Sequence, residues 1–265
     1  MTRIMAILNV TPDSFSDGGQ FADVDEAIKR GVELRDQGAD IVDVGGESTR
    51  PGAERVPTAE EQSRVLPVVR ELVAAGVTVS LDTMNAETAL AGAAAGASII
   101  NDVSGGLADP EMYRAVAETG VSYVAMHWRR GLDAGVAETY DDVVADVRQE
   151  LKERLAEMII WGIDLRKVIL DPGLGFAKTA EQSWALLGHL SDLGTLGHPV
   201  LVGSSRKRFV RALRPEGEVA DHDAATAAIS ALAASAGAWG VRVHDVPATK
   251  LALDTWNAWQ NGSRS

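Results

Sequence analysis

The feature that most constrains this chain is a series of eight short apolar runs, each of which ends on a polar or charged group. In chain order the runs end at Asn9, residues 45–48, Asp82, Asn101, His127, Asp171, residues 203–207 and His244. Apolar strands that alternate with helical segments are typical of a parallel sheet covered by helices. Eight of them predict a closed barrel, in which the loops after the strands build the active site.

The length and composition suit one such barrel. The chain has 265 residues, of which 46% are hydrophobic, and barrels of this kind take about 250 residues. No linker, low-complexity tract or charge block divides the chain, so we expect an α/β fold with a single (β/α)8 TIM-barrel domain over residues 1–265. The connections at 9–23 and 45–57 are long and rich in Gly, Pro, Ser and Asp. We expect mobile loops there, after the first and second strands.

Charge and cysteine content exclude several classes of function. The net charge of −13 argues against nucleic acid as a partner, because nucleic-acid affinity comes largely from Lys and Arg contacts to phosphates. No apolar stretch approaches the roughly 20 residues that span a bilayer, and Asn9 interrupts the N-terminal run before a signal-peptide core can form. We therefore expect no membrane contact and a cytoplasmic location. The absence of Cys excludes thiolate chemistry and disulfides.

Several local patterns predict where helices begin and end. Apolar residues in 138–161 recur at i+3/i+4 spacing, which predicts a helix there. Thr58 with Glu61, and Thr179 with Gln182, have the spacing of capping boxes that open helices. Glycines that follow helical segments and precede strands predict helix C-termini at Gly38, Gly76, Gly96, Gly120 and Gly162.

Two basic groups follow the last two strands. Arg242 and His244 are two residues apart, so strand alternation puts both on one face, where they would form a cationic pair suited to phosphate. A surface Arg beside a hydrogen-bonded His would give the same pattern. Residues 203–208, with the sequence GSSRKR, resemble a helix-start anion site after the seventh strand. A solvated basic turn is the alternative.

A second group of polar residues ends strands three, four and six. If Asp82, Asn101 and Asp171 point into the barrel, two carboxylates and a carboxamide form a directional set suited to a flat heterocycle with amide and amino edges. Lys207 could donate to a ring carbonyl or nitrogen. Loop capping by Asp and Asn is the alternative for each one alone.

The histidines do not form a recognisable zinc motif. Five His are present, and none are paired at HExxH or similar spacing. Magnesium carried by substrate phosphates needs only one or two protein oxygens, and Asn9 could supply one.

Eight motifs in this order resemble those of the dihydropteroate synthases, the folate-biosynthesis enzymes that sulfonamides target, over nearly the whole chain. They are NVTPDSFSDGG at 9–19, DVGGESTRPG at 43–52, DT at 82–83, NDVSG at 101–105, MH at 126–127, DPGLGF at 171–176, SRK at 205–207 and RVHD at 242–245. The first two are long and specific. The text around residues 126–129 and 239–242 resembles actinobacterial members.

The resemblance implies that 6-hydroxymethyl-7,8-dihydropterin pyrophosphate condenses with p-aminobenzoate to give 7,8-dihydropteroate and pyrophosphate. It implies a transferase with Mg²⁺ as cofactor, a homodimer, and an interface near helices at 222–261. The implied pterin-binding residues are Asp82, Asn101, Asp171 and Lys207. The implied pyrophosphate residues are Asn9, Arg242 and His244, with Asn9 reaching the metal. The implied p-aminobenzoate residues are Phe15, Thr49, Arg50, Pro51, Phe176 and Ser205.

The implied mechanism is dissociative. Pyrophosphate leaves first, helped by Mg²⁺, Arg242 and His244, and Asp17 stabilises the positive charge left on the pterin methylene. With Lys207, these three residues form the implied catalytic set. This chain departs from many members by having Arg208 after the motif lysine and Gln182-Ser183 in the sixth segment.

Two other functions are alternatives. A non-catalytic pterin-binding paralogue could keep the pterin residues, but the intact motifs at 9–19 and 45–52 argue against it. A methyltransferase of the same barrel class, acting on methyltetrahydrofolate, fits residues 48–51 and the Arg242/His244 pair poorly.

Overall fold

The computed structural model describes residues 1–11, 20–47, 55–129 and 139–263. Its strands are β1 (Arg3–Asn9), β2 (Ile41–Gly45), β3 (Val79–Asp82), β4 (Ile99–Asp102), β5 (Ser122–Met126), β6 (Val168–Asp171), β7 (Leu201–Val202) and β8 (Gly240–Val243). All neighbouring strands pair in parallel, in the order β6-β5-β4-β3-β2-β1-β8-β7. A single bridge from Leu170 to Val200 closes the ring between β6 and β7. The predicted eight-stranded barrel is confirmed.

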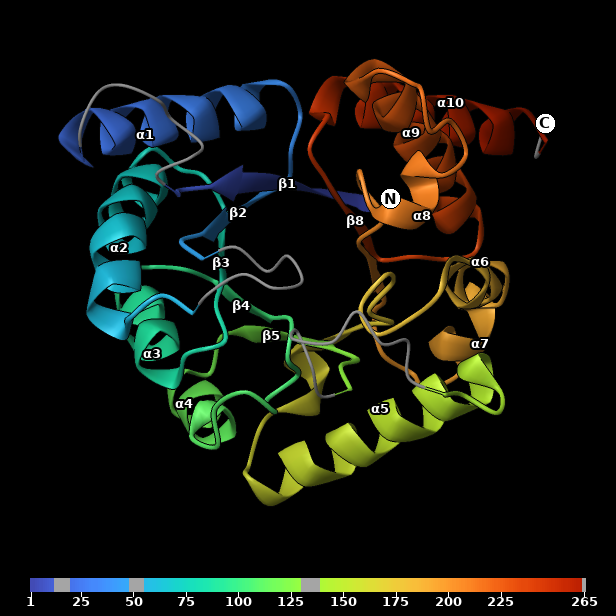
Figure 1. Cartoon of the computed structure of the whole chain (residues 1–265). Coiled ribbons are helices and arrows are strands. Elements are labelled where there is room, and N and C mark those ends of the chain that lie inside the picture. Colours follow the sequence, from blue (N-terminus) through green and yellow to red (C-terminus); the bar gives the residue numbers. More distant parts are fainter. Residues whose placement is uncertain (12–19, 48–54, 130–138, 264–265) are drawn as a thin grey trace.

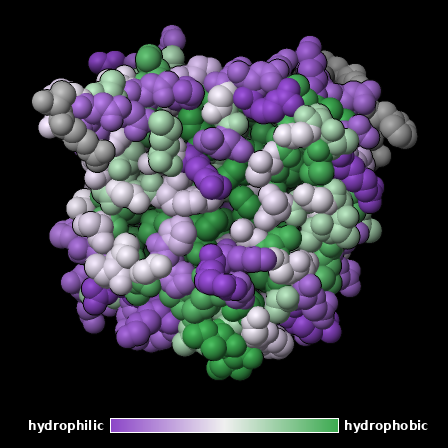
Figure 2. All heavy atoms as spheres, turned by 180° about the vertical axis from the view of Figure 1, so that it is seen from behind, coloured by the Kyte–Doolittle hydropathy of each residue, from purple (hydrophilic) through white to green (hydrophobic). Residues whose placement is uncertain are grey.

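Helices surround the strands as an outer ring (Figure 1). They are α1 (Gln20–Asp36), α2 (Thr58–Ala74), α3 (Ala86–Ala94), α4 (Met112–Thr119), α5 (Val143–Ile160), α6 (Ala180–Gly188), α7 (Leu190–Gly194), α8 (Arg208–Arg211), α9 (Val219–Ser235) and α10 (Val246–Gly262), with a 3-10 turn η1 (Leu165–Lys167). Within the described ranges, no helix is both long enough and apolar enough to cross a membrane. On the side opposite to that of Figure 1, hydrophilic and hydrophobic residues are interspersed, with a small hydrophobic group at the lower edge (Figure 2).

Strand alternation divides the core into two layers. One set of buried side chains packs inside the barrel: Met5, Ile41, Ile99, Val124, Ile169 and Leu201. Their neighbours along the strands, such as Val42 and Leu170, belong to the larger apolar cluster under the helices. Several inward positions closer to the carboxyl ends of the strands are polar, namely Asp43, Asp82, Asn101, Asp171 and Arg242, so the apolar layer lies beneath a group of polar side chains at one end of the barrel.

Of the two predicted capping boxes, one is present and the other is not. Thr179 and Gln182 form the predicted capping box, with the Gln182 amide donating to Thr179 Oγ1 at 3.2 Å and the Thr179 amide donating to Gln182 Oε1 at 2.8 Å. The predicted box at Thr58 is wrong, since α2 has no side-chain cap. Glu61 is instead buried and accepts hydrogen bonds from Thr83 Oγ1 and Thr88 Oγ1, both at 2.7 Å. Two hydroxyls on the neighbouring βα unit satisfy this buried carboxylate better than one backbone amide could.

The remaining local predictions concern glycines and loops. The five predicted helix-terminal glycines all have positive φ, between 60° at Gly120 and 107° at Gly38. Helix α1 begins at Gln20, so the first connection is shorter than the predicted 9–23. The greater part of both long connections, at 12–19 and 48–54, lies outside the described residues.

Candidate active site at the carboxyl ends of the strands

The strand register places the predicted pterin-binding residues side by side. Asn9 is in register with Gly45, Gly45 with Asp82, and Asp82 with Asn101. These residues lie at or near the carboxyl ends of four consecutive strands. Asp171 ends β6 on the other side of the barrel. Parallel strands thus bring groups that are far apart in the sequence to one edge, as predicted.

Arg242 lies among carboxylates at the centre of this end. Its Nε donates to Asp43 Oδ2 and its Nη2 to Asp82 Oδ2, both at 2.6 Å. Asn101 Nδ2 donates to the same Asp43 oxygen at 2.9 Å. Asp43 is fully buried, and its Oδ1 makes no hydrogen bond to any described residue. Asp43 therefore orients both Arg242 and Asn101, which leaves Asn101 Oδ1 and the second N–H of Nδ2 available to a ligand.

Asp43 was quoted within a motif but was not predicted as a site residue. The signal was present, because Asp43 stands two positions before Gly45 in β2 and strand alternation points both the same way. A carboxylate at an inward position of a buried strand requires a partner. Nothing in the local sequence identified Arg242, 199 residues away, as that partner.

The same cluster changes the ionisation of Asp82. Burial raises the pKa of Asp82 to about 7; the Arg242 guanidinium opposes this shift, and the negative charge of Asp43 adds to it. Near neutral pH this carboxyl can therefore be present as an acid, which donates, or as a carboxylate, which accepts.

Asp171 and Lys207 form the second half of the site. The Gly173 amide donates to Asp171 Oδ1 at 2.7 Å. Lys207 Nζ donates to the Leu174 carbonyl at 2.6 Å and lies 4.6 Å from the centre of the Phe176 ring. Burial raises the pKa of Asp171 and lowers the pKa of Lys207 to about 8, while the opposite charge of each counteracts the shift of the other.

Gly203 marks the point where the two halves converge. A β-carbon built on Gly203 would lie 3.5 Å from Asp171 Oδ2, 3.7 Å from Lys207 Nζ and 4.0 Å from Arg242 Cβ. Its missing side chain leaves a space surrounded by the Asp171 carboxylate at the end of β6, the Lys207 ammonium just before α8 and the base of the Arg242 side chain in β8. The sequence named this glycine within residues 203–207 but did not predict this role.

His244 is held separately from Arg242. Its Nδ1 lies 2.9 Å from Ser205 Oγ, and its backbone amide donates to the same oxygen at 3.1 Å. Ser205 is buried. The structure therefore places the Arg242 head on carboxylates and the His244 ring on a hydroxyl, so the two groups predicted as a cationic pair have different partners.

The other predicted residues divide into described and undescribed ones. Asn9 is exposed at the end of β1, and its side chain makes no hydrogen bond to the described residues. An exposed amide oxygen of this kind fits a single contact to Mg²⁺. Across the described ranges, no three His, Asp or Glu gather as a protein-only metal site. Five predicted residues lie outside the described residues: Phe15, Asp17, Thr49, Arg50 and Pro51.

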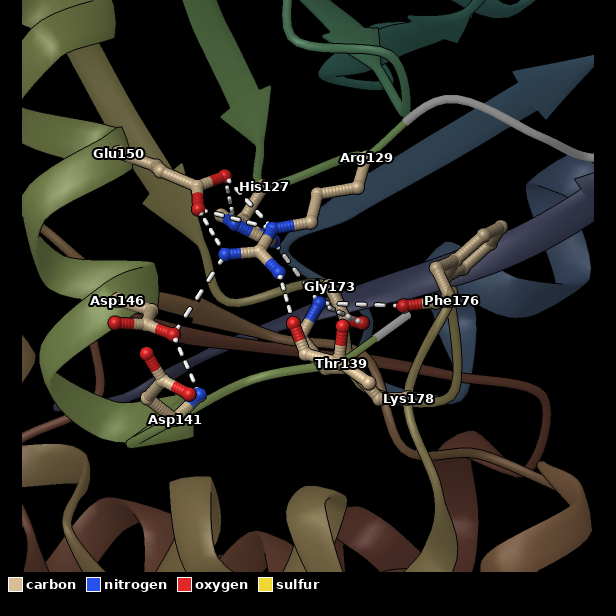
Figure 3. Close-up of polar contacts among 9 residues, drawn as sticks. All are labelled: His127, Arg129, Thr139, Asp141, Asp146, Glu150, Gly173, Phe176 and Lys178. Carbon is tan, nitrogen blue, oxygen red and sulfur yellow. Dashed lines mark hydrogen bonds and ion pairs between the residues drawn. The ribbon is translucent and has the colours of Figure 1, made fainter. Parts of the chain in front are cut away.

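A second polar cluster surrounds His127, which directly follows β5 (Figure 3). His127 is 3% exposed; its Nδ1 lies 2.9 Å from Lys178 Nζ and its Nε2 lies 3.0 Å from Glu150 Oε2. Arg129 also binds Glu150, through Nε at 2.9 Å. Neither Lys178 nor Glu150 was singled out in the sequence, because neither stands at a strand end.

A parallel barrel with carboxylates, a carboxamide and a lysine at one end defines an enzyme class that binds a flat, polar heterocycle. Residues 5–244 match the family model described as pterin binding enzyme. The dihydropteroate synthase of Mycobacterium leprae is 51% identical over 264 residues, which cover 97% of this chain and 93% of that protein.

Solved structures agree with this match. The Xanthomonas albilineans dihydropteroate synthase with 4-aminobenzoic acid has a TM-score of 0.91 and 46% identity, covering 98% of this chain and 93% of that one. The same enzyme with 7,8-dihydropteroate has a TM-score of 0.88 and 44% identity, covering 98% and 94%. The chain belongs to the pterin-binding enzyme family and, within it, to the dihydropteroate synthases, which are transferases.

Proposed function

We propose that this chain condenses 6-hydroxymethyl-7,8-dihydropterin pyrophosphate with p-aminobenzoate to form 7,8-dihydropteroate and pyrophosphate. The observation that carries the proposal is the convergence of Asp171, Lys207 and Arg242 on the space beside Gly203. The relatives support it, since the X. albilineans enzyme binds 4-aminobenzoic acid and 7,8-dihydropteroate.

The pterin edge is bound by groups whose hydrogen-bonding roles the protein has already assigned. Asp171 uses Oδ1 on the Gly173 amide, so Oδ2 accepts from the amino and ring N–H groups of the pterin. Asn101 presents Oδ1 and one N–H, because the other N–H of Nδ2 is bound to Asp43. Lys207 donates to the ring carbonyl or nitrogen, and Asp82 accepts or donates according to its protonation.

The leaving pyrophosphate is bound by Asn9, Arg242 and His244. Nε and one N–H of Nη2 of Arg242 are bound to Asp43 and Asp82, so Nη1 and the second N–H of Nη2 are the donors left for an incoming phosphate oxygen. Fixed donors of this kind stabilise charge that develops on the leaving group. Asn9 would hold Mg²⁺ together with phosphate oxygens, and the ion when bound would neutralise part of the pyrophosphate charge.

The reaction is dissociative. The bond between the pterin methylene carbon and the pyrophosphate oxygen breaks, and its electron pair leaves with pyrophosphate. The remaining cation is delocalised into the pterin ring, and Asp17 stabilises its charge. The neutral amine of p-aminobenzoate then attacks the methylene carbon and loses a proton to solvent. Binding both substrates in line supplies the proximity on which such a step depends.

We assign the p-aminobenzoate site to residues from several loops: Phe15, Thr49, Arg50, Pro51, Phe176 and Ser205. Phe176 and Ser205 are among the described residues. Ser205 is engaged by His244, so its hydroxyl links the two substrate sites. Arg208, at the start of α8, stands where many members of the family have Ser. The carboxylate of p-aminobenzoate is therefore bound by backbone amides together with Ser205 or Arg208.

An assay of pyrophosphate release with both substrates and Mg²⁺ tests the function. We expect release that depends on p-aminobenzoate, and about 10- to 100-fold weaker binding of the pterin substrate in Asp171→Asn, because a charge-assisted contact is worth about 1.5–3 kcal/mol. The matched control is Asp164→Asn, since the Asp164 side chain caps η1 and is 35% exposed. Absence of p-aminobenzoate-dependent release by folded protein would refute the proposal. Tight calorimetric binding of the pterin substrate without turnover would favour the non-catalytic paralogue.

We further propose a cytoplasmic homodimer formed through α9 and α10. These helices pack against each other and expose Leu232, Leu251 and Trp259, with relative exposures of 68%, 70% and 74%. Exposed apolar groups on adjacent helices are typical of interfaces. Sedimentation should show a dimer that Leu251→Arg dissociates; a monomeric parent protein would contradict this, and cell fractionation tests the location.

A further inference from the structure

The buried ammonium of Lys178 has an unusual set of partners. Lys178 is 4% exposed, and its Nζ donates to His127 Nδ1 at 2.9 Å, to the Gly173 carbonyl at 3.1 Å and to the Phe176 carbonyl at 3.2 Å (Figure 3). All three acceptors are neutral. Buried charges are normally paired with an opposite charge, so the three contacts made here serve geometry more than charge compensation.

The ring of His127 gives this set its direction. Its Nε2 lies 3.0 Å from Glu150 Oε2, and an ionised carboxylate can only accept, so Nε2 carries the proton and Nδ1 accepts from Lys178. Burial lowers the pKa of His127 to about 4, which keeps the ring neutral. The hydrogen bond from His127 lowers the pKa of Glu150 to about 2, and Arg129 adds to the effect. A permanent carboxylate on α5 thus orients a neutral ring toward the lysine.

The two carbonyls that Lys178 binds belong to the turn that carries part of the active site. The Leu174 carbonyl, which lies between them in the sequence, accepts a hydrogen bond from Lys207 Nζ, and the Phe176 ring also lies beside the Lys207 ammonium. The Gly173 amide binds Asp171. One side of the turn therefore faces the pterin-binding groups, and the other side is bound to Lys178.

The turn needs such a restraint. Gly173 has φ of 67° and Ala177 has φ of 47°, and a positive φ at a residue with a side chain costs about 1 kcal/mol or more. A β-carbon on Gly173 would lie 2.1 Å from the His127 carbonyl oxygen, so the turn packs directly on the end of β5. Strained backbone of this kind persists only where the surroundings hold it.

We propose that Lys178, oriented by His127 and Glu150, is a positioning residue that fixes the 173–176 turn and thereby aims the Lys207 ammonium at the pterin. This role rests on the proposed function, and it assigns to Lys178 no contact with substrate. It predicts that loss of the Lys178 amine weakens pterin binding more than it slows the chemical step.

The hydrogen bonds of Lys178 depend on its protonation and therefore on pH. Among the described residues, the ionisable and aromatic groups that contact Lys178 or act on its charge are His127, Arg129, Tyr140, Glu150, Asp171 and Lys207. Burial and, secondly, the positive charge of Lys207 lower the pKa of Lys178 to about 7. A neutral amine has two N–H groups for three acceptors, so above this pH one contact is lost and the turn loosens.

The absence of cysteine from the chain permits a clean test. Lys178→Cys can be alkylated in denaturant with bromoethylamine, which restores a lysine-like side chain, or with bromopropane, which gives a neutral one of equal length. After refolding, we expect the neutral form and Lys178→Met to show about a tenfold higher KM for the pterin substrate, equal to about 1.4 kcal/mol, with a smaller change in kcat. The amine-bearing form should restore KM to within about threefold of the parent value. Lys152→Met, exposed on α5, is the control.

A second readout does not depend on turnover. The ¹³Cε resonance of Lys207 should shift in the substrate-free Lys178→Met variant, because its carbonyl partner moves. Equal KM values for the two alkylated forms, or an unchanged Lys207 resonance in a folded Lys178→Met variant, would overturn the proposal. Failure of the proposed function would instead appear as no pyrophosphate release by the parent protein, with the Lys207 shift still present.

Discussion

Replacing Asp43 by Asn tests the carboxylate cluster at the centre of the site. Asp43 Oδ2 accepts two hydrogen bonds, at 2.6 Å from Arg242 and at 2.9 Å from Asn101. In Asp43→Asn a neutral carbonyl oxygen replaces this charged acceptor, and the new amide NH2 replaces Oδ1, which makes no hydrogen bond to the described residues. The change keeps the size of the side chain, so its effect reports on charge and hydrogen bonding.

The magnitude follows from the buried guanidinium. A hydrogen bond to a charged group is worth about 1.5–3 kcal/mol, and removing one partner of a buried pair costs about 3–5 kcal/mol. In the variant Arg242 still pairs with Asp82, its side chain is 19% exposed, and the buried charge of Asp43 is gone. The lower end of these energy ranges therefore applies. We expect a loss of about 2 kcal/mol in the free energy of unfolding. The pKa of Asp82 should also fall below its present value of about 7, because Asp43 is one of the charges that raise it.

Urea unfolding at pH 7 measures the first effect, and ¹³C NMR titration of the Asp82 carboxyl measures the second. Asp254→Asn is the matched control, since Asp254 is 55% exposed and pairs with Lys250 on the surface of α10. We expect a change below about 0.5 kcal/mol for it. An Asp43→Asn variant that is as stable as this control and keeps the pKa of Asp82 would refute the assigned role of Asp43.

Three further predictions use other parts of the site and fold. The folded-state pKa of Asp82, about 7, lies above its unfolded value of about 3.9, so the folded protein binds the extra proton between these values. Asp82 therefore adds stability at low pH that is lost as pH rises through 7, and parallel urea titrations should show that Asp82→Asn lacks this component; identical pH profiles would contradict it. Gly203→Ala should fold normally, because its new contacts are no closer than 3.5 Å, yet lose pterin binding in calorimetry, whereas Gly188→Ala, with nothing within 4 Å, should bind as the parent does; unaltered binding by Gly203→Ala would show that the space is not used. Thr179→Ala should lower the free energy of unfolding by about 1 kcal/mol through loss of the capping box, and a change under about 0.3 kcal/mol would show that this cap is dispensable.

Much of the fold could be predicted because its signals are local. The apolar runs and the helical periodicity between them depend on neighbours within a few residues, and they gave the parallel barrel and the strand-end positions of Asp82, Asn101 and Asp171. The capping box at Thr179 was predicted for the same reason, since both partners lie within one helical turn. The motifs identified the family, which the comparisons confirmed.

The errors and omissions arose where a polar group had a distant partner. Glu61 had the spacing of a capping residue, but its carboxylate is buried and binds the hydroxyls of Thr83, just after β3, and of Thr88 in α3. Arg242 and His244 share a strand face by alternation, yet their side chains reach different partners.

The sequence by itself determined the order of the elements, the end of the barrel at which polar groups gather, and the family. Only the tertiary structure decided which charges meet, because burial requires each polar group to find a partner and the nearest one in space is set by strand register. Arg242 with Asp43, 199 residues apart, and Lys178 with His127, 51 residues apart, are two such pairs. The first organises the carboxylates that we propose bind the pterin, and Lys178 of the second also binds the turn that carries Leu174 and Phe176 beside Lys207.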